Sequence, residues 1–481
     1  MIMFRTALVA PCAVMLFIAQ PTGAQPFDVY RTHRLISDTP AAPILKGTSC
    51  VAEVIDRAIE LEEAILLAIC ANPQAHQAWA NARAQAAAVG VAEAANLPTL
   101  NATGGYERDT LRTTYNIAGY GSYTAPTQAS SSKYGTLNLS WVLFDFGKRR
   151  AALRHARELL VAASATQDDV LQSVFFNAAH AYYAVRDAQA SVDAARQTEG
   201  IVQQSLAEAT AKYGAGVGTL SDQLQAQTIY RRAVLDRVNA EGNVRTVTGV
   251  LATAMGFDAN TPVRIAASEP TTDGAEFSDG VDQLIDEAKV RQPKLVTARA
   301  KLEAARANVD VARTQGRPMV SLVGSRTNNN PSYGQQSQRL GQTLSGSQGT
   351  SIGIQVTIPL FEGFASGYRV AQSQAEADAQ EADVRNTELQ VSLDVWKSYQ
   401  SLRTDTMNLD NSKYLLADAR YTLEIARGRY RAGVGTFAEL LNAQSSFADA
   451  QKQRVLAVSR WHTARLKLAA SLGSLGLWNM R

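Results

Sequence analysis

The sequence YGAGVGT at residues 213–219 recurs as YRAGVGT at residues 430–436, at an offset of 217 residues. Two further pairs keep this offset: LFD at 143–145 with LFE at 360–362, and Met255-Gly256 with Leu472-Gly473. Chance does not hold a constant register over more than a hundred residues, so the chain contains a tandem duplication. Each copy is therefore expected to form the same structural unit.

The repeat extends upstream of these blocks at an offset of 220 residues. Pro73 and Pro98 correspond to Pro293 and Pro318, and both pairs enclose a segment rich in alanine and arginine. The stretch between the two blocks differs in length by three residues. We divide the chain accordingly: signal peptide 1–24, N-terminal extension 25–60, first repeat 61–256, linker 257–280, second repeat 281–473 and C-terminal tail 474–481.

Each repeat is expected to begin with a helix and to contain a second, much longer one. The first helix would cover about 36 residues, Glu62 to Leu97 in the first copy, with an interruption at Asn72-Pro73 and an end at Pro98. The long helix, from about Phe146 to Tyr213, has no proline in roughly 68 residues. It would be ~100 Å long at ~1.5 Å per residue.

A third helix of about 38 residues would return from Thr219 to Gly256 after the glycine-rich turn. The two short helices together nearly match the long one in length, so we expect them to stack end to end along it. Apolar residues in the long helix recur at intervals of three and four, which is typical of a packed helical tube or coiled coil. They are Leu171, Val174, Phe175, Ala178, Tyr182 and Val185.

The hydrophobic period changes to two after Pro98, which predicts strands between the first and second helices. The segment from Gly104 to Tyr134, rich in Gly, Ser, Thr and Tyr, is expected to be a long polar hairpin loop. Alternation over about nine residues is typical of a transmembrane β-strand, with lipid on the apolar side. The predicted lipid-facing residues are Leu137, Leu139 and Trp141 in the first copy, and Ile354, Val356 and Ile358 in the second.

The alternating strands have a second interpretation, because a half-buried hairpin in a soluble sheet shows the same pattern. Two strands per repeat are too few to close a barrel, so a membrane-spanning barrel would need several chains. The predicted fold class is mostly α with β: long coiled-coil helices in a tunnel, plus four strands per chain.

Composition and charge exclude several classes of protein. The chain has 481 residues, 46% of them apolar, which is enough to bury substantial surface. Its 47 Lys and Arg against 44 Asp and Glu give a net charge of +3, too small for a nucleic-acid-binding footprint. Arg5, the apolar run 6–19 and the small residues Thr22-Gly23-Ala24 resemble an export signal. The alternative is an N-terminal membrane anchor.

Two cysteines, Cys50 and Cys70, remain after cleavage of that signal. In an oxidising compartment an even pair indicates a disulfide. One unbroken helix over residues 51–71 would hold the two thiols ~30 Å apart, so the disulfide predicts a break near Glu60. The alternative is two unpaired buried thiols.

Three patterns that suggest catalysis or metal binding lack the context they need. Residues 214–218 (GAGVG) resemble a phosphate loop but follow a helix, whereas a nucleotide site follows a strand. Residues 349–353 (GTSIG) fit the nucleophile-elbow pattern but open a strand. The five histidines have no metal-ligand spacing: His33, His76, His155, His180 and His462. We therefore expect no catalytic residue, metal or cofactor.

A set of motifs in fixed order connects the chain to a known family. They are Leu61-x-x-Ala64, Asn72-Pro73, Leu97-Pro98, Phe144-Asp-Phe-Gly147, Ala181-Tyr-Tyr183 and Tyr213-x-x-Gly216-x-Gly218-Thr219-x-x-Asp222-x-x-x-Ala226. Together they resemble the TolC family of outer-membrane export channels. The resemblance implies a homotrimer in which each subunit gives four strands to a twelve-stranded barrel above a helical tunnel across the periplasm. It also implies a periplasmic adaptor and an inner-membrane ABC or proton-driven pump as partners, and no enzymatic activity.

The resemblance also implies a gate near the two glycine-rich turns. By position, Ser221 and Asp222 match the family's polar pair, Tyr430 matches the tyrosine that it bonds, and Glu439 and Asn442 match two acidic positions. The family's gate-tying arginine falls on Gly435, and Asn442 replaces an acid, so the chain departs from the family's usual lock at both positions. The alternative interpretation is that Glu439 and Asp222 are solvated helix residues just after a turn, with no role in a gate. The hairpin tips expected to meet the adaptor are Gly214, Gly216, Gly218, Gly433 and Gly435.

The cargo is a separate question. Cys50 and the sequence AICANPQAHQAW at 68–79 resemble the branch of the family that includes the cyclolysin secretion protein, which favours type I protein secretion. Small-molecule efflux is the rival function. A periplasmic coiled-coil scaffold and a secreted enzyme are the alternatives from other classes, and the alternating strands argue against the scaffold.

Overall fold

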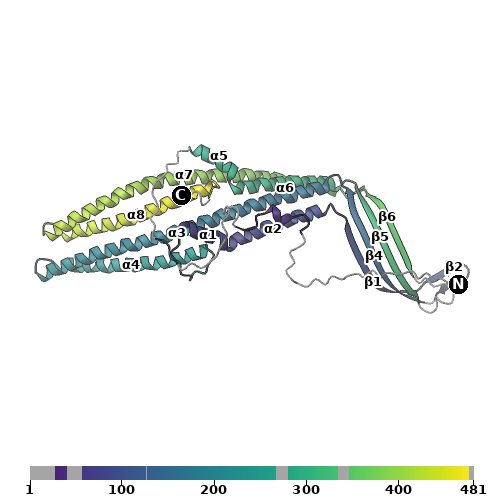
Figure 1. Cartoon of the computed structure of the whole chain (residues 1–481), viewed down its shortest axis with the longest axis horizontal. Coiled ribbons are helices and arrows are strands. Elements are labelled where there is room, and N and C mark those ends of the chain that lie inside the picture. The colour runs from purple at the N-terminus through teal and green to yellow at the C-terminus, as the bar shows by residue number, and fades with distance from the viewer. Residues whose placement is uncertain (1–27, 41–56, 126, 267–279, 334–345, 476–481) are drawn as a thin grey trace, which may run out of the picture.

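The computed structural model describes residues 28–40, 57–125, 127–266, 280–333 and 346–475. The molecule is a long bundle of helices with a β-sheet projecting from one end (Figure 1). The predicted signal peptide, Cys50, and parts of the predicted linker and C-terminal tail lie outside the described residues.

The helices repeat as the sequence predicts. The first copy contains α1 (Leu61–Ala71), α2 (Pro73–Ala94), α3 (Lys148–Gly214) and α4 (Leu220–Ala254). The second contains α5 (Val281–Arg291), α6 (Pro293–Gln315), α7 (Ala365–Arg431) and α8 (Phe437–Ser471). The bounds of α3 and α4 reappear in α7 and α8 at the offset of 217, which confirms the duplication. No helix in the described ranges is both long and apolar enough to cross a membrane.

The proline of each repeat divides the expected first helix into two. Asn72 adopts an extended conformation, its side chain caps α2 by accepting a hydrogen bond from the Gln74 N–H (2.8 Å), and Pro73 opens that helix. α2 then ends at Ala94, before Leu97, because the residue preceding Pro98 avoids the helical conformation. In the described residues α1 begins at Leu61, so a helix break lies near Glu60 as predicted.

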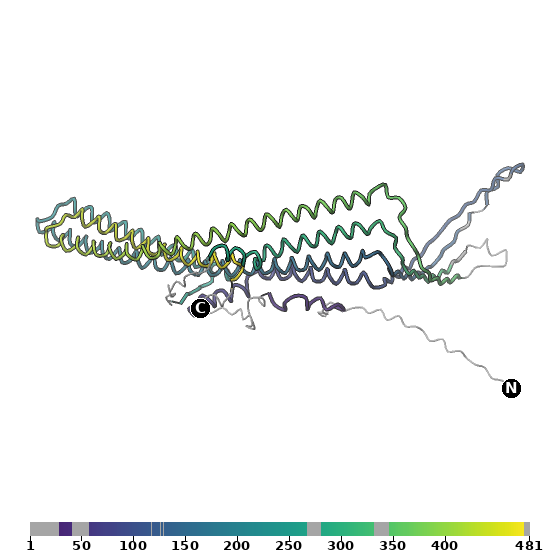
Figure 2. Tube along the Cα trace, turned by 90° about the horizontal axis from the view of Figure 1, so that it is seen from above, coloured from purple at the N-terminus to yellow at the C-terminus, as the bar shows by residue number. Residues whose placement is uncertain are grey.

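The short helices stack end to end along the long ones, as expected. The Asn72 side chain donates to the Ala254 carbonyl at the end of α4 (3.1 Å). Gly256, with φ 88°, lies so near Ala71 that a Cβ would come within 2.7 Å of its backbone. In the second copy Gln292 donates to the Ser471 carbonyl at the end of α8 (3.1 Å). Figure 2 shows the resulting elongated bundle, with the strands at one end and both hairpin tips at the other.

The strands form one antiparallel sheet in the order β1-β4-β5-β6. Their bounds are β1 (Thr99–Leu111), β4 (Gln128–Phe144), β5 (Met319–Tyr333) and β6 (Ser347–Thr357). The β4–β5 pair joins the two repeats, and β1 and β6 are the outer strands. A small hairpin, β2 (Thr114–Ile117) with β3 (Gly121–Thr124), lies between β1 and β4.

The expected polar loop from Gly104 to Tyr134 was wrong. β1 continues to Leu111 and β4 starts at Gln128, so most of this segment is paired strand. Its Thr, Ser and Tyr side chains resemble loop composition, but they also suit a strand whose faces are both outside a protein core. The pairing with β5 that continues along this part of β4 is a tertiary contact, which local composition does not encode.

Apolar clusters lie along the long helices. The largest surrounds Phe175 of α3, where α1 packs against the middle of this helix. A second surrounds Trp461 and Val395 and joins α5, α7 and α8. A third, around Phe437 and Leu440, joins the two hairpins near their tips. Alanine is frequent in these clusters, which lets the helix backbones approach closely.

Candidate functional site

The two glycine-rich turns have the same backbone structure. In the first, the N–H groups of Val217 and Gly218 both donate to the Lys212 carbonyl, each at 3.0 Å. In the second, Val434 and Gly435 donate to the Arg429 carbonyl at 3.0 and 3.1 Å. Gly216 and Gly433 occupy the left-handed region, with φ 75° and 74°. The Thr after each turn caps the next helix.

Gly435 is required by this turn. A Cβ at position 435 would lie 2.8 Å from the Cβ of Arg429 and 3.1 Å from its carbonyl carbon. Gly218 makes the equivalent close approach to Lys212. An arginine at 435, which the family resemblance leads one to look for, therefore does not fit this turn without a shift of the backbone.

The predicted acidic residues lie in the first turns of α4 and α8. The Thr219 hydroxyl accepts a hydrogen bond from the Asp222 N–H, and the Thr436 hydroxyl accepts one from the Glu439 N–H, both at 3.1 Å. Acidic side chains are favoured there by the helix dipole. The Glu439 carboxylate lies 3.7 Å from Nε of Arg429, with both side chains half exposed. Each acid thus has a structural role in its own hairpin.

Tyr430 is buried between the two hairpins. Its ring packs against Phe437 (centroids 5.5 Å apart), and Nζ of Lys212 lies 3.9 Å from the ring centroid while donating to the Tyr430 carbonyl. Burial, and then the charges of Asp222 and Glu208, raise the pKa of the Tyr430 hydroxyl. Tyr430 is therefore near Asp222, but no hydrogen bond joins these two described residues.

Ser221 and Asn442 complete the predicted gate set. Both are exposed, and the Ser221 hydroxyl accepts a hydrogen bond from Gln225 within α4 (3.2 Å). Within a single chain the structure brings Asp222, Tyr430 and Lys212 together at the tip. It does not bring Asn442 into that group of contacts.

An ion-pair cluster at the tip was missed by the sequence analysis. Glu208 of α3 accepts hydrogen bonds from Nε (2.8 Å) and Nη2 (2.5 Å) of Arg431 on α7, and Arg427 lies 3.7 Å away. Bonding to Glu208 raises the pKa of Arg431. The other copy has no equivalent ion pair, since Ile425 corresponds to Glu208 and Gly214 corresponds to Arg431. The spacing of Arg427 and Arg431 by four residues was the available signal, but it does not identify a partner.

The sheet sorts its side chains onto two faces. The strand register places Trp141 beside Leu322, and Leu322 beside Ile354. The residues sharing this side, which we call the apolar face, are Leu100, Ala102, Leu137, Leu139, Trp141, Val320, Leu322, Ile352, Ile354 and Val356. The other face holds mainly Ser, Thr and Asn. Ile358 follows the end of β6 rather than lying within it, because Pro359 ends the strand.

Apolar residues on this face occupy a band of limited height. From Val320 to Arg326 along β5 the distance is ~20 Å at ~3.4 Å per residue. Arg326, and Lys133 further along β4, follow on the same side. A band of this height, bounded by polar residues, suits the hydrocarbon region of an outer membrane.

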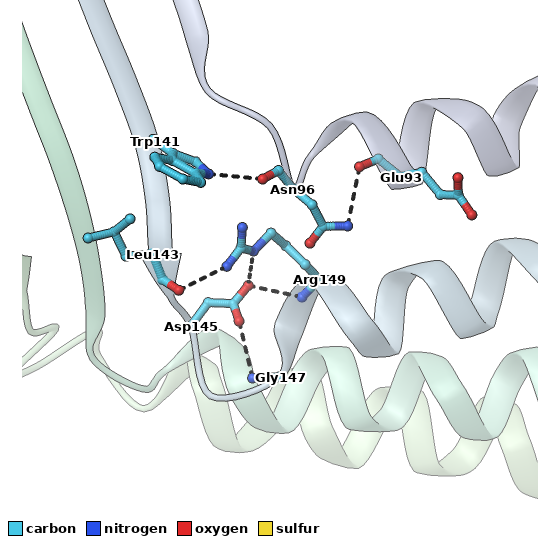
Figure 3. A network of polar contacts seen from close by, with 7 residues as sticks. All are labelled: Glu93, Asn96, Trp141, Leu143, Asp145, Gly147 and Arg149. Carbon is cyan, nitrogen blue, oxygen red and sulfur yellow. Dashed lines mark hydrogen bonds and ion pairs between the residues drawn. The ribbon is translucent and has the colours of Figure 1, made fainter. Parts of the chain in front are cut away.

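A polar network connects the sheet to the helices (Figure 3). Nε1 of Trp141 donates to the Asn96 carbonyl (2.9 Å), and Nε of Arg149 donates to Asp145 (2.8 Å). Partial burial opposes ionisation of Asp145, but the hydrogen bonds and charge of Arg149 outweigh it and hold the pKa of Asp145 below its usual value. The bend from β4 into α3 is thereby fixed.

Cys70 takes part in a disulfide bond. Its pairing with Cys50 stays a prediction because Cys50 lies outside the described residues. No three His, Cys, Asp or Glu side chains in the described ranges are grouped to hold a metal ion.

A four-stranded sheet with one apolar face, carried on helices ~100 Å long, defines the class of tubular channel proteins that cross a membrane with strands. Comparison with known proteins identifies the family. The family model described as "Outer membrane efflux protein" matches residues 64–256 and 284–474, so the chain belongs to this family.

Individual relatives agree with this assignment. The chain is 32% identical to the protein CyaE of Bordetella pertussis over 418 residues, 87% of this chain and 85% of CyaE. It is 22% identical to the outer membrane protein TolC of Escherichia coli over 356 residues, 72% of this chain and 70% of TolC. The crystal structure of VceC from Vibrio cholerae aligns with a TM-score of 0.71 at 21% identity, covering 86% of this chain and 96% of VceC.

The chain is therefore an outer-membrane efflux or secretion channel of the TolC type, with a long periplasmic tunnel. The family consists of channels and not of enzymes. Channels of this type form trimers and work within tripartite efflux or secretion systems.

Proposed function

We propose that this chain is one subunit of a homotrimeric duct that passes a protein toxin from an inner-membrane pump and a periplasmic adaptor to the outside. The observation that carries the proposal is the sheet. Its apolar face is exposed, and no strand among the described residues pairs with the outer edges of β1 and β6. Four strands cannot close a barrel, and an unpaired edge is not tolerated in lipid.

Three copies satisfy these requirements together. If β6 of one subunit pairs with β1 of the next, twelve strands close into one barrel with the apolar faces outward and the Ser- and Thr-rich faces around the lumen. Twelve is an even number within the range of outer-membrane barrels. The proposal therefore predicts that Leu137, Leu139, Trp141, Ile354 and Val356 contact lipid.

The hairpin tips form the periplasmic end of the proposed duct. Ser221, Asp222, Tyr430, Glu439 and Asn442 would lie at its constriction, and the glycines of the two turns would meet the adaptor. In place of the arginine excluded at Gly435, we propose that Glu208 and Arg431 tie the two hairpins of one subunit. This is supported by the two hydrogen bonds between them, which join α3 directly to α7.

Type I protein secretion is the cargo pathway we favour. The residues around Cys70 resemble the branch containing the cyclolysin secretion protein, and 87% of the chain matches CyaE at 32% identity. Small-molecule efflux is the alternative, because the matched family is described as efflux proteins. Either pump type, ABC or proton-driven, is compatible with the duct.

The duct is tested by purifying the chain from outer membranes in detergent and measuring its size and its conductance in planar bilayers. We expect a trimer that conducts ions. A monomer recovered from the soluble periplasm would contradict the proposal. For the cargo, deletion of the gene should abolish toxin release and leave drug sensitivity unchanged, and the reverse result would favour efflux.

A further inference from the structure

The bend between the sheet and the helices has a distinctive chemistry. Here β4 ends, residues 145–147 turn, and α3 begins at Lys148. Arg317, at the end of α6, lies 5.8 Å from the ring centroid of Phe146. We call residues 141–150, together with Arg317, the corner. The apolar face ends here, since Phe144 pairs with Val320 in its last row on β4.

Aromatic rings are exposed at the corner at the cost of backbone strain. Phe146 has φ 52° and Phe364 at the second bend has φ 62°, a region that non-glycine residues rarely adopt. Phe146 is 41% exposed and Phe364 is 75% exposed. Neither backbone strain nor exposure of a large apolar ring stabilises the isolated chain. Strain retained at both bends points to an external contact for these rings.

Cations without an acidic partner among the described residues lie at the corner. The carboxylates at the two bends are already occupied: Asp145 binds Arg149, and Glu362 binds Arg369 at 3.0 Å. Lys148, Arg150 and Arg317 are exposed, and none has an acidic partner in the described part of the chain. Two of these cations, with Arg149, occupy the first turn of α3, where the helix dipole disfavours positive charge. An external anion would relieve this repulsion.

We propose that the corner binds the phosphate groups of anionic phospholipids in the membrane leaflet nearest the helical tunnel. This rests on the proposed membrane position of the sheet. An apolar band, a ring of aromatic side chains and then free cations is the order in which a protein surface meets acyl chains, the interface and anionic head groups. Trp141, at the start of the corner, belongs to this aromatic layer, and its indole N–H donates to the Asn96 carbonyl (Figure 3).

The alternative occupant is an acidic surface of the next subunit, which would neutralise the cations without lipid. The two differ in an observable way. Lipid binding makes the lipid composition next to Trp141 depend on head-group charge, whereas a subunit contact does not.

Trp141 provides the measurement. The full-length mature protein would be reconstituted into vesicles of phosphatidylcholine containing either brominated phosphatidylcholine or brominated phosphatidylglycerol, whose acyl chains quench tryptophan fluorescence. The difference between the wild type and Trp141→Phe isolates the Trp141 signal. We expect phosphatidylglycerol to be preferred by about fivefold or more at low salt, the factor that one basic side chain near an anionic surface contributes. At about 1 M salt, where the Debye length is about 3 Å, the preference should fall toward one.

Variants locate the effect. In Lys148→Gln/Arg150→Gln/Arg317→Gln the preference should be lost at low salt, and in the control Arg232→Gln/Arg245→Gln/Lys397→Gln, all exposed and distant from the sheet, it should persist. If the triple variant does not insert, the single variant Arg150→Gln and the salt dependence of the wild type give the same test.

The outcomes separate this inference from the function it rests on. Equal quenching of the wild type by both lipids, or an unchanged preference in the triple variant, would overturn lipid recognition while leaving the duct intact. Absence of Trp141 quenching by either lipid would place β4 outside the membrane and overturn both.

Discussion

The long helices α3 and α7 have equivalent bounds and equal lengths of 67 residues, yet they differ in packing. α3 contacts helices of both repeats, namely α1, α2 and α4 of its own and α6 and α8 of the other. The extensive contacts of α7 are confined to α5, α6 and α8 of its own repeat. Accordingly, α3 exposes two large hydrophobic side chains and α7 exposes nine.

We infer from this difference where the next subunit packs. Because α6 and α8 cover α3 on the side away from α2 and α4, the same arrangement would be completed on α7 by α2 and α4 of a neighbouring copy. In each chain, therefore, the long helix of the first repeat is packed on both sides, whereas the long helix of the second repeat leaves one side exposed. An open face of this kind generates a closed ring when the rotation between copies is constant.

The largest effect is expected from a substitution that introduces a charge on the exposed side of α7. Trp396 on α7 is 47% exposed and Val161 on α3 is 46% exposed, so the two are matched in the single chain. Trp396→Glu should abolish the trimer, because an unpaired carboxylate buried at a subunit interface costs several kcal/mol at each of the three interfaces. Val161→Glu should leave the trimer intact. Native mass spectrometry in detergent measures both, and a stable Trp396→Glu trimer would refute the assignment of the interface.

A second consequence concerns the packed side of α3. His462 of α8 is buried, and its ring stacks on Tyr183 of α3 with centroids 4.3 Å apart. Burial, then the charges of Arg186 and Arg465, lower its pKa to about 4. The neutral ring therefore contributes stability that is complete above its unfolded pKa of about 6.5 and is lost as the pH falls toward 4. The loss is at most about 3 kcal/mol per subunit.

The variant His462→Gln should reduce this pH dependence. The fall in melting temperature between pH 7 and pH 4, followed by circular dichroism, should be smaller than in the wild type. Burial also raises the pKa of Asp187, so only the difference between the two proteins reports His462. Arg245→Gln, the equivalent position of the first repeat, is the control and should match the wild type. An equal fall in all three proteins would remove His462 from the explanation.

A smaller effect is expected at the hairpin turns, where the copies can be compared position by position. Gly435→Arg should destabilise the second tip by about 1–3 kcal/mol, because the new Cβ meets a neighbouring Cβ and backbone atoms that cannot rotate away. Gly214→Arg is the matched control, since a Cβ there meets nothing and the second copy already has Arg431 at this position. Hydrogen exchange of the turn amides measures the local stability. Equal protection in both variants would show that the close approach does not matter.

The sequence predicts the backbone well wherever the signals are local. Pro73, Pro98, the glycine-rich turns and their capping threonines fixed the helix ends to within a few residues, and the constant offset carried each boundary into the second copy. End-to-end stacking also followed from lengths alone. Each of these inferences needed only residues close in sequence or a comparison of the two copies.

Contacts between distant segments were not predictable in this way. Within Gly104–Tyr134, β1 pairs with β4, and β4 also pairs with β5, which is about 200 residues away; this pairing overrode a loop-like composition. The Glu208–Arg431 pair depends on how α3 meets α7, and the duplication conceals it because neither residue has a charged counterpart of the same kind in the other copy. Family resemblance directed attention to Gly435 instead, where the turn geometry excludes a side chain.

The smallest expected effect comes from removing single ion pairs: one pair joins the two hairpins, and the other lies within one hairpin. Glu208→Gln removes the charge that joins α3 to Arg431, whereas Arg429→Gln removes the pair with Glu439 inside the α7–α8 hairpin. Arg431 is about half exposed and regains water, so we expect only a two- to fivefold rise in the open fraction of the channel. Conductance in planar bilayers at low salt measures this fraction.

Arg429→Gln should leave the open fraction unchanged, because both ends of its ion pair move together when the hairpins separate. High salt should raise the open fraction of the wild type toward that of Glu208→Gln, since it screens the same charge pair. If both variants open equally, the ties between hairpins do not hold the gate, and the asymmetry between the copies at Glu208 has no role in gating. If only Glu208→Gln opens, the gate depends on a residue that the duplication did not supply to the other copy.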